Sequence, residues 1–88
     1  MPDADATVRV VAATYLGIIH EDGPSSVPLL AVALEDPDPA VRRASATALA
    51  AFGGEAAPAL PALKKAAADQ DPDLAREAGR AMVQIGGK

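Results

Sequence analysis

The 88-residue chain contains no cysteine and no tryptophan, and it has one histidine, one tyrosine and one phenylalanine. Without cysteine the chain cannot form a disulfide and has no thiolate for catalysis or for binding a metal. One histidine is too few for a histidine-rich metal centre. The longest apolar run, residues 10–19, is too short to span a bilayer. These shortages exclude thiol chemistry and argue against metal and membrane-spanning classes.

Basic charge is also scarce, because 8 Lys and Arg face 12 Asp and Glu, and the net charge is −4. The basic residues are dispersed along the chain, whereas binding to nucleic acid requires a basic patch and anionic membranes attract clustered Lys and Arg. Asp3 and Asp5 stand where a signal peptide would carry positive charge. We therefore expect a soluble, cytoplasmic protein that binds neither nucleic acid nor membranes.

Half of the residues are apolar, and many of them are alanine, which favours helix and close approach of backbones. The clearest helix is predicted over residues 39–52. Asp38 is its expected N-cap, Pro39 fits the first helical position, and Gly53-Gly54 ends it in the left-handed conformation. Its predicted inner face follows helical spacing and consists of Val41, Ala44, Ser45, Ala48, Leu49 and Phe52.

This helical unit recurs with a period of 33 residues, the spacing of Asp38 and Asp71, and no gap is needed. Asp38-Pro39 aligns with Asp71-Pro72, and one period earlier the cap position is held by Asp5. A fixed period of this size is typical of stacked helical repeats. We expect units at about 5–22, 23–55 and 56–88.

Five helices are predicted, at residues 6–19, from Ser25 or Ser26 to 35, 39–52, 58–68 and 72–85. Short connections between them predict antiparallel neighbours. The expected core consists of Leu16, Leu30, Val41, Leu49, Phe52, Leu60, Leu63 and Met82.

The unit at 36–53, Asp-Pro-Asp-Pro-x-Val-Arg-Arg-Ala followed by Ala-Leu and Phe-Gly, resembles a HEAT repeat of the short bacterial type. That type also occurs in phycobilin-lyase-like proteins. The half-unit at 57–63 resembles the first helix of such a repeat. The resemblance covers about residues 5–87. It implies a single HEAT-like repeat domain over residues 1–88, an all-α right-handed α-solenoid of five antiparallel helices with about two and a half repeats.

Some positions depart from the pattern, since Ala75 stands where the preceding unit has Arg42, and His20 stands in the place of Gly53. These differences weaken single helix ends and leave the repeat assignment intact. Ankyrin repeats share a period of this size, but their Thr-Pro-Leu-His signature is missing.

His20-Glu21 is the one pair that invites a metal interpretation. HEAT-like di-iron hydroxylases resembling deoxyhypusine hydroxylase use several His-Glu pairs on inner helices, whereas this chain has one pair in a loop. A helix C-cap with a favourable dipole interaction explains His20 better. The repeated aspartates lack the glycine and distal glutamate of a calcium loop and are interpreted as N-caps. We therefore predict no catalytic residue, no cofactor and no metal site.

Five arginines form a possible stripe along the first, third and fifth helices. They can act as a structural ladder, pairing with the aspartates that begin neighbouring units (Asp36, Asp38, Asp69 and Asp71), or as a recognition stripe for an acidic partner. These arginines are Arg9, Arg42, Arg43, Arg76 and Arg80.

The helix at 6–19 is apolar almost all round, and a helix of that kind is normally buried. Its core face is predicted to contain Val8, Val11, Ala12, Tyr15, Leu16 and Ile19. Because an uncovered apolar patch marks an interface, the candidate interface residues are Val8, Val10, Val11, Tyr15 and Ile18. Either residues 1–88 are the C-terminal piece of a longer solenoid, or two copies form a homodimer through this helix about a two-fold axis.

The functional prediction is a non-catalytic scaffold or adaptor that binds a protein partner of unknown identity on a rigid curved surface. The protein is expected not to be an enzyme. The alternative is a subunit or fragment of a HEAT-like enzyme, either bilin lyase-like or di-iron hydroxylase-like.

Overall fold

The computed structural model describes residues 5–86, and within that range it contains helices and no strand. The α-helices are α1 (Ala6–Ile19), α2 (Gly23–Ala33), α3 (Pro39–Phe52), α4 (Leu60–Ala67) and α5 (Pro72–Gly86), with a 3₁₀ segment, η1 (Gly53–Ala59), before α4. The prediction of an all-α chain with five helices is confirmed. None of the described helices is both long and apolar enough to cross a bilayer.

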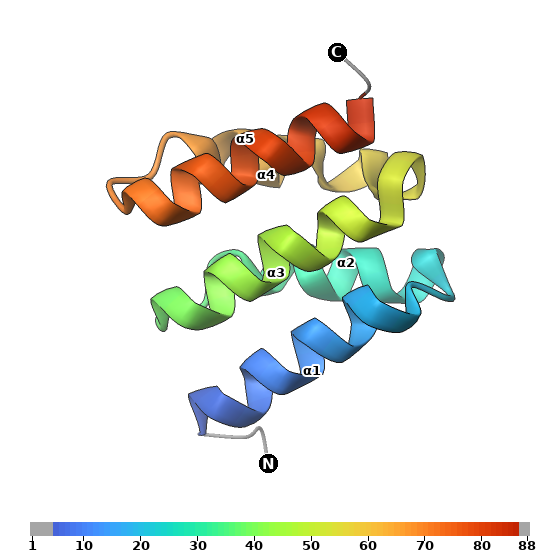
Figure 1. Cartoon of the computed structure of the whole chain (residues 1–88), viewed down its shortest axis with the longest axis horizontal. Coiled ribbons are helices and arrows are strands. Elements are labelled where there is room, and N and C mark those ends of the chain that lie inside the picture. The colour runs from blue at the N-terminus through green and yellow to red at the C-terminus, as the bar shows by residue number, and fades with distance from the viewer. Residues whose placement is uncertain (1–4, 87–88) are drawn as a thin grey trace.

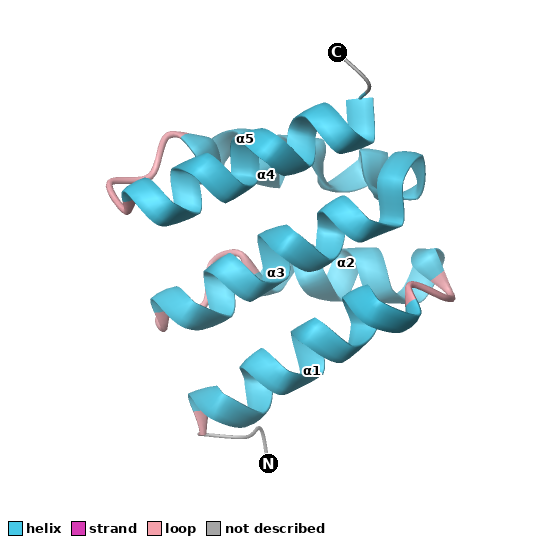
Figure 2. Cartoon of the chain, in the orientation of Figure 1, coloured by secondary structure: helices cyan, strands magenta, loops and turns pink. Residues whose placement is uncertain are grey.

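The helices form two layers, with α1, α3 and α5 side by side in the front layer and α2 and α4 behind them (Figure 1). The shortest dimension of the molecule is 17 Å, as expected for two layers of helices whose axes are 8–10 Å apart. The front-layer helices stack in order, α1 on α3 and α3 on α5, and nearly all of the chain is helical (Figure 2). The result is a helical-repeat solenoid.

The predicted aspartate caps are confirmed in all three units. Asp5, Asp38 and Asp71 each use Oδ1 to accept the backbone N–H two residues further on, at 2.9, 2.8 and 3.0 Å. These bonds satisfy N–H groups that have no partner within the helix. The period of 33 residues therefore reappears as a repeated start to each front-layer helix.

The second helix begins earlier than predicted, because Asp22 precedes it and neither Ser25 nor Ser26 is its N-cap. The backbone N–H groups of both serines already donate to the Asp22 carbonyl, at 3.1 and 2.9 Å, so the first turn is formed. Pro24 lies in this turn, where its missing N–H leaves no bond unmade.

The expected turn at Gly53-Gly54 is also different. Gly53 has a positive φ of 59°, but its ψ of −138° lies outside the left-handed helical region and suits glycine alone. The chain then remains helical through the 3₁₀ segment η1, and α4 begins at Leu60 rather than at Pro58. Pro58 lacks an N–H and cannot continue a backbone hydrogen-bond ladder, and the regular α-helix begins only after it.

Five of the eight predicted core residues are buried, namely Leu30, Val41, Leu49, Phe52 and Leu63. The other three, Leu16, Leu60 and Met82, are half-buried at the margin of the core. Much of the remaining core is alanine, at positions 13, 46, 48, 56, 59, 66, 78 and 81. Small side chains let the front-layer backbones approach closely.

Candidate interaction surface

Four large apolar side chains of α1 form an exposed row at positions 8, 11, 15 and 18. Val8 is 48% exposed, Val11 60%, Tyr15 59% and Ile18 70%. Val10, the fifth candidate interface residue, is half-buried. The buried residues of α1 are Ala13 and Gly17. The predicted core face of this helix was therefore wrong for Val8, Val11, Ala12 and Tyr15, because α1 turns its small residues inward.

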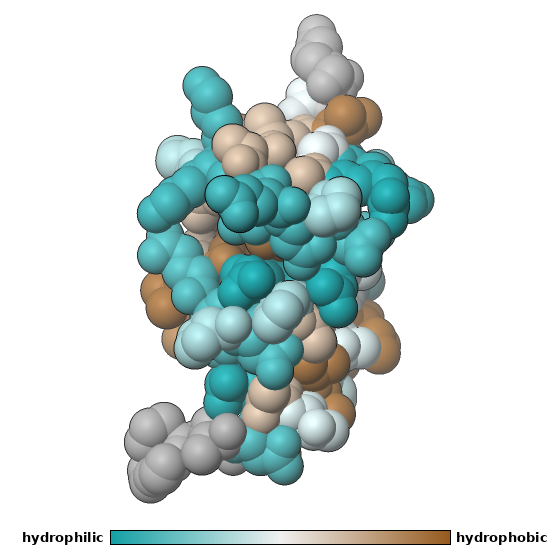
Figure 3. All heavy atoms as spheres, turned by 90° about the vertical axis from the view of Figure 1, so that its left-hand side faces the viewer, coloured by the Kyte–Doolittle hydropathy of each residue, from teal (hydrophilic) through white to brown (hydrophobic). Residues whose placement is uncertain are grey.

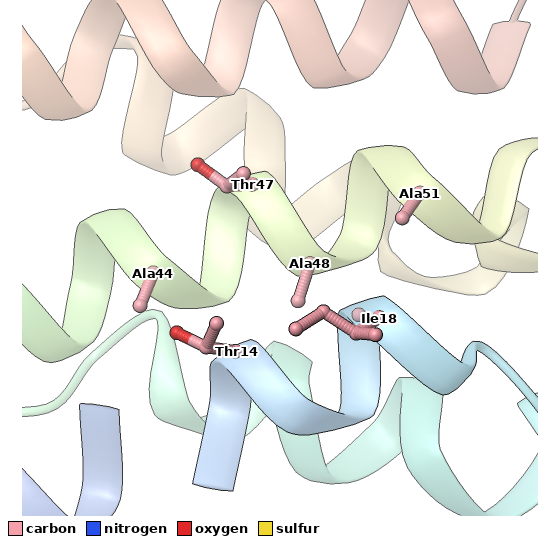
Figure 4. Close-up of a pocket in the computed structure, with 7 residues that line it drawn as sticks. Thr14, Ile18, Ala44, Thr47, Ala48 and Ala51 are labelled. Atoms are coloured by element: carbon pink, nitrogen blue, oxygen red, sulfur yellow. The ribbon is translucent and has the colours of Figure 1, made fainter. Parts of the chain in front are cut away.

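The contact between α1 and α3 explains this orientation. A Cβ added to Gly17 would lie 2.8 Å from Cα of Ala48, so the two backbones are nearly in contact. Beside this contact the two helices leave a shallow groove of about 350 Å³. Figure 4 shows the groove, with Thr14 and Ile18 on α1 below Ala44 and Ala48 on α3, whereas Thr47 points away from α1.

The repeat gives the exposed row a structural meaning. Val11, Tyr15 and Ile18 lie one period before Ala44, Ala48 and Ala51, which are the α3 residues that face α1. The corresponding face of α5 faces α3, because Glu77 Oε1 accepts a hydrogen bond from Thr47 Oγ1 at 3.4 Å. Val11 and Tyr15 thus hold stacking positions that a later front-layer helix presents to the helix before it, whereas Ile18 also borders the groove between α1 and α3.

Two side chains of α2 extend this exposed surface, and neither is among the predicted interface residues. Leu29 is 64% exposed and Val32 is 75% exposed. A hollow between α1 and α2 is lined by Ala12, Leu16 and Leu29 among others, and it connects the two helices. We call the six exposed residues the N-terminal face: Val8, Val11, Tyr15, Ile18, Leu29 and Val32. The substitution of Val32 by Lys65 in the next unit was the available signal.

The edge at which the front-layer helices begin is polar, as Figure 3 shows. Two arginines link successive units there. Arg9 binds Asp36 through two contacts, Nε to Oδ2 at 2.8 Å and Nη2 to Oδ1 at 3.1 Å. Arg43 Nη1 contacts Asp71 Oδ2 at 3.1 Å. Each pair joins a helix to the turn or cap of the following unit.

The other three arginines have different surroundings. Arg42 Nη1 donates to the carbonyls of Asp36 and Pro37, at 2.7 and 3.1 Å. Arg76 contacts Asp73 in its own helix, at 2.6 Å. Arg80 is exposed on α5, and no ion pair joins it to another residue between 5 and 86.

These contacts change the acidity of two carboxyls. The hydrogen bond from the Arg9 side chain, with one from the Asp38 backbone, lowers the pKa of Asp36 below its ordinary value. For Asp71, burial raises the pKa, but the backbone N–H groups of Asp73 and Leu74 together with Arg43 outweigh it and lower the pKa. Both carboxylates are therefore more stable in the charged form when the chain is folded.

His20 lies at the C-terminus of α1, where its backbone N–H donates to the Leu16 carbonyl at 2.8 Å. Its ring packs edge-on against Phe52, with centroids 6.3 Å apart, and Nδ1 lies 3.1 Å from the Ile18 carbonyl oxygen. The described part of the chain brings together no group of three His, Cys, Asp or Glu side chains that could hold a metal.

Comparison with known proteins agrees with the repeat geometry. The family described as HEAT repeats matches residues 1–86. No curated protein and no solved structure matches the chain. The match spans almost the whole sequence, and the predicted resemblance is confirmed. With its capped front-layer helices repeating every 33 residues, the chain belongs to the HEAT repeat family.

Proposed function

We propose that this protein is a non-catalytic interaction scaffold that binds a protein partner through its N-terminal face. The observation that supports this proposal is the exposed row on α1. Single apolar side chains on a surface are ordinary, but Val8 and Tyr15 hold positions that are buried in both later units. Their equivalents are Val41 and Leu74, and Ala48 and Ala81. Contiguous apolar surface of this kind marks binding sites.

The chemistry of the face suits a helical partner. Burying a valine, leucine or isoleucine side chain contributes about 1.5–3 kcal/mol, and the tyrosine adds a large ring with a hydroxyl that can reach a polar partner at the rim. α1 is already fixed by its close contact with α3 at Gly17 and Ala48. Binding therefore orders little of the scaffold, which favours affinity.

The test begins with a photo-crosslinking aromatic amino acid in place of Tyr15, compared with the same group at Ala57, which is exposed on η1. A protein that crosslinks only from position 15 is purified, and its affinity is measured by calorimetry. We expect Ile18→Glu to weaken binding by at least about 30-fold, since a central interface residue contributes about 2 kcal/mol or more. Ala57→Glu, which adds the same charge elsewhere, should bind like the wild type.

Ile18 is 70% exposed, so glutamate there should leave the fold intact, and circular dichroism of both variants checks this. Equal affinity of the Ile18→Glu and Ala57→Glu variants for the partner would contradict the proposal. Equal crosslinking from positions 15 and 57 would contradict it as well.

A further inference from the structure

The opposite end of the front layer carries a second stacking face. Its residues on α5 are Arg76, Gly79, Arg80 and Val83, which we call the C-terminal face. One period earlier the same positions on α3 are Arg43, Ala46, Thr47 and Ala50. This face of α3 packs on α5, since Ala46 is fully buried, Arg43 contacts Asp71 and Thr47 contacts Glu77.

The equivalent face of α1 packs on α3 in the same way, because Gly17, which is equivalent to Val83, lies against Ala48 of α3. The chain therefore shows, at two internal junctions, which faces of its front-layer helices fit each other. At its ends it leaves one face of each kind exposed, with Ile18 at 70% on α1 and Val83 at 55% on α5.

We propose that the N-terminal face binds the C-terminal face of a second copy, so that copies stack head to tail and α1 of one continues the front layer after α5 of the other. This inference rests on the proposed function and identifies the partner as the protein itself. It makes the interface heterologous, with different residues on its two sides.

Charge complementarity supports this pairing. In the stack, Arg76 takes the place of Arg43 and Asp5 of the next copy takes the place of Asp71. Asp71 caps its helix by accepting the Asp73 N–H with Oδ1, while its Oδ2 contacts Arg43. A capping aspartate can therefore also pair with the arginine of the neighbouring helix. The contact of Arg76 with Asp73 is largely exposed, and an exposed pair is weak enough to exchange.

The shapes of the two faces also correspond. The contact of Gly17 with Ala48 becomes a contact of Val83 with Tyr15 of the next copy. It is apolar but larger on both sides, so α5 and the next α1 must lie farther apart than α1 and α3 do. The larger side chains of α1 need space on the opposite helix, and Gly79 provides it, since a Cβ there would meet nothing within 4 Å. Ala13 and Ala46 hold the same position at the internal junctions.

The exposed apolar area is that of a small interface. A whole apolar side chain offers on the order of 60–120 Å², and the six side chains of the N-terminal face are 48–75% exposed. Together they offer roughly 230–450 Å², which is about a quarter to a half of the about 800 Å² per partner of a standard interface. The association should therefore be weak and reversible.

Two-fold pairing of N-terminal faces is disfavoured by charge. Antiparallel packing of two α1 helices about the middle of the exposed row, near residue 13, places Asp5 of one copy opposite Glu21 and Asp22 of the other. All three are exposed carboxylates, and like charges brought opposite each other repel. Head-to-tail stacking instead brings Asp5 to an arginine.

Complementation of two variants tests the proposal by sedimentation equilibrium. Ile18→Glu introduces a charge into the N-terminal face and leaves the C-terminal face unchanged. Val83→Glu introduces a charge into the C-terminal face and leaves the N-terminal face unchanged. The wild type should associate reversibly and with rising mass up to about 1 mM. Each variant alone should associate at least about 30-fold more weakly. Their equimolar mixture should form a one-to-one dimer with wild-type affinity, and Ala57→Glu should behave like the wild type.

Three outcomes would overturn the inference. A Val83→Glu variant that dimerises normally while Ile18→Glu does not would indicate two-fold pairing. A mixture that stays monomeric would exclude complementary faces, and a wild type that is monomeric throughout would exclude self-association. In that last case, crosslinking of another protein from position 15 would leave the proposed function standing, so the two failures are distinguishable. Arg80→Glu is the second variant of the C-terminal face, should Val83→Glu lose its helical circular dichroism.

Discussion

Adding one methyl group at Gly17 is the sharpest test of the packing in the front layer. Glycine in the interior of a helix lowers stability relative to alanine by about 0.5–1 kcal/mol, so Gly17→Ala would be stabilising if helix propensity alone mattered. The added Cβ, however, would lie 2.8 Å from Cα and 2.9 Å from Cβ of Ala48. Real Cβ atoms do not approach backbone atoms so closely, so α1 and α3 must move apart.

The control is Gly79→Ala on α5, where the new Cβ would meet nothing within 4 Å. Both variants gain the same helix propensity, so their difference isolates the cost of overpacking, which is typically about 1–3 kcal/mol. We expect Gly79→Ala to be more stable than the wild type by about 0.5–1 kcal/mol. Gly17→Ala should be less stable than Gly79→Ala by about 1–3 kcal/mol, because the clash is with backbone and cannot be relieved by a rotamer change.

Urea unfolding followed by circular dichroism at micromolar concentration measures both differences. In thermal unfolding, each 1 kcal/mol corresponds to about 4–8 °C for a domain of this size, so the two variants are easily resolved. If Gly17→Ala gained as much stability as Gly79→Ala, the close approach of α1 to α3 would be wrong.

Three further predictions concern the core, the caps and the ion pairs. Phe52→Ala should lower the free energy of unfolding by about 3–5 kcal/mol, because it removes a buried ring; a cooperative wild-type-like transition would contradict this. Asp38→Ala should lower it by about 0.5–2 kcal/mol through loss of the cap, with Asp38→Asn as the near-neutral control in the same urea titration. Asp36 and Asp71 have folded-state pKa values below the unfolded value of about 3.9. The stability that they contribute is complete above that pH and is lost as the pH falls through the folded-state values. Urea titrations below about pH 4 should therefore show that the free energy of unfolding falls more steeply with pH in the wild type than in Arg9→Gln/Arg43→Gln. Equal slopes of the two proteins would contradict a stabilising role for these ion pairs.

The front-layer helices could be predicted well because their ends depend on local chemistry. Asp38 followed by Pro39 specifies a helix start through one side-chain oxygen and one fixed φ. The same pair recurs at Asp71-Pro72, and both helices begin where the sequence indicates. A signal contained in two adjacent residues does not depend on the rest of the fold.

The start of α2 and the path after α3 could not be predicted in this way. The serines at 25 and 26 are good caps by type, but Asp22 takes a left-handed conformation (φ 53°, ψ 55°) that no pattern in the sequence indicates. After Gly53, the sequence is compatible with either a turn or a 3₁₀ segment. Pro58 allows both, and the contacts of η1 with α2 and α5 favour the segment that the structure shows.

The orientation of α1 was the most consequential error, and it has a general physical cause. Hydrophobic periodicity assigns the largest apolar residues to the core, which placed Val11 and Tyr15 inside. α1 instead buries its small residues Ala13 and Gly17, because Gly17 against Ala48 lets two backbones approach in a way that a large side chain would prevent. The size of a stacking position, compared across the repeat, would have been the better guide.

That comparison also connects the sequence to the proposed interface. At positions 44, 48 and 51 α3 has alanine throughout, whereas one period earlier the exposed residues of α1 are Val11, Tyr15 and Ile18. Large apolar residues there cannot serve the close packing of the interior, and exposing them to water is unfavourable. The proposed head-to-tail contact places them against α5, where a Cβ added at Gly79 would meet nothing within 4 Å. The change from small to large residues at a stacking position is therefore the feature of α1 on which the proposed interface depends.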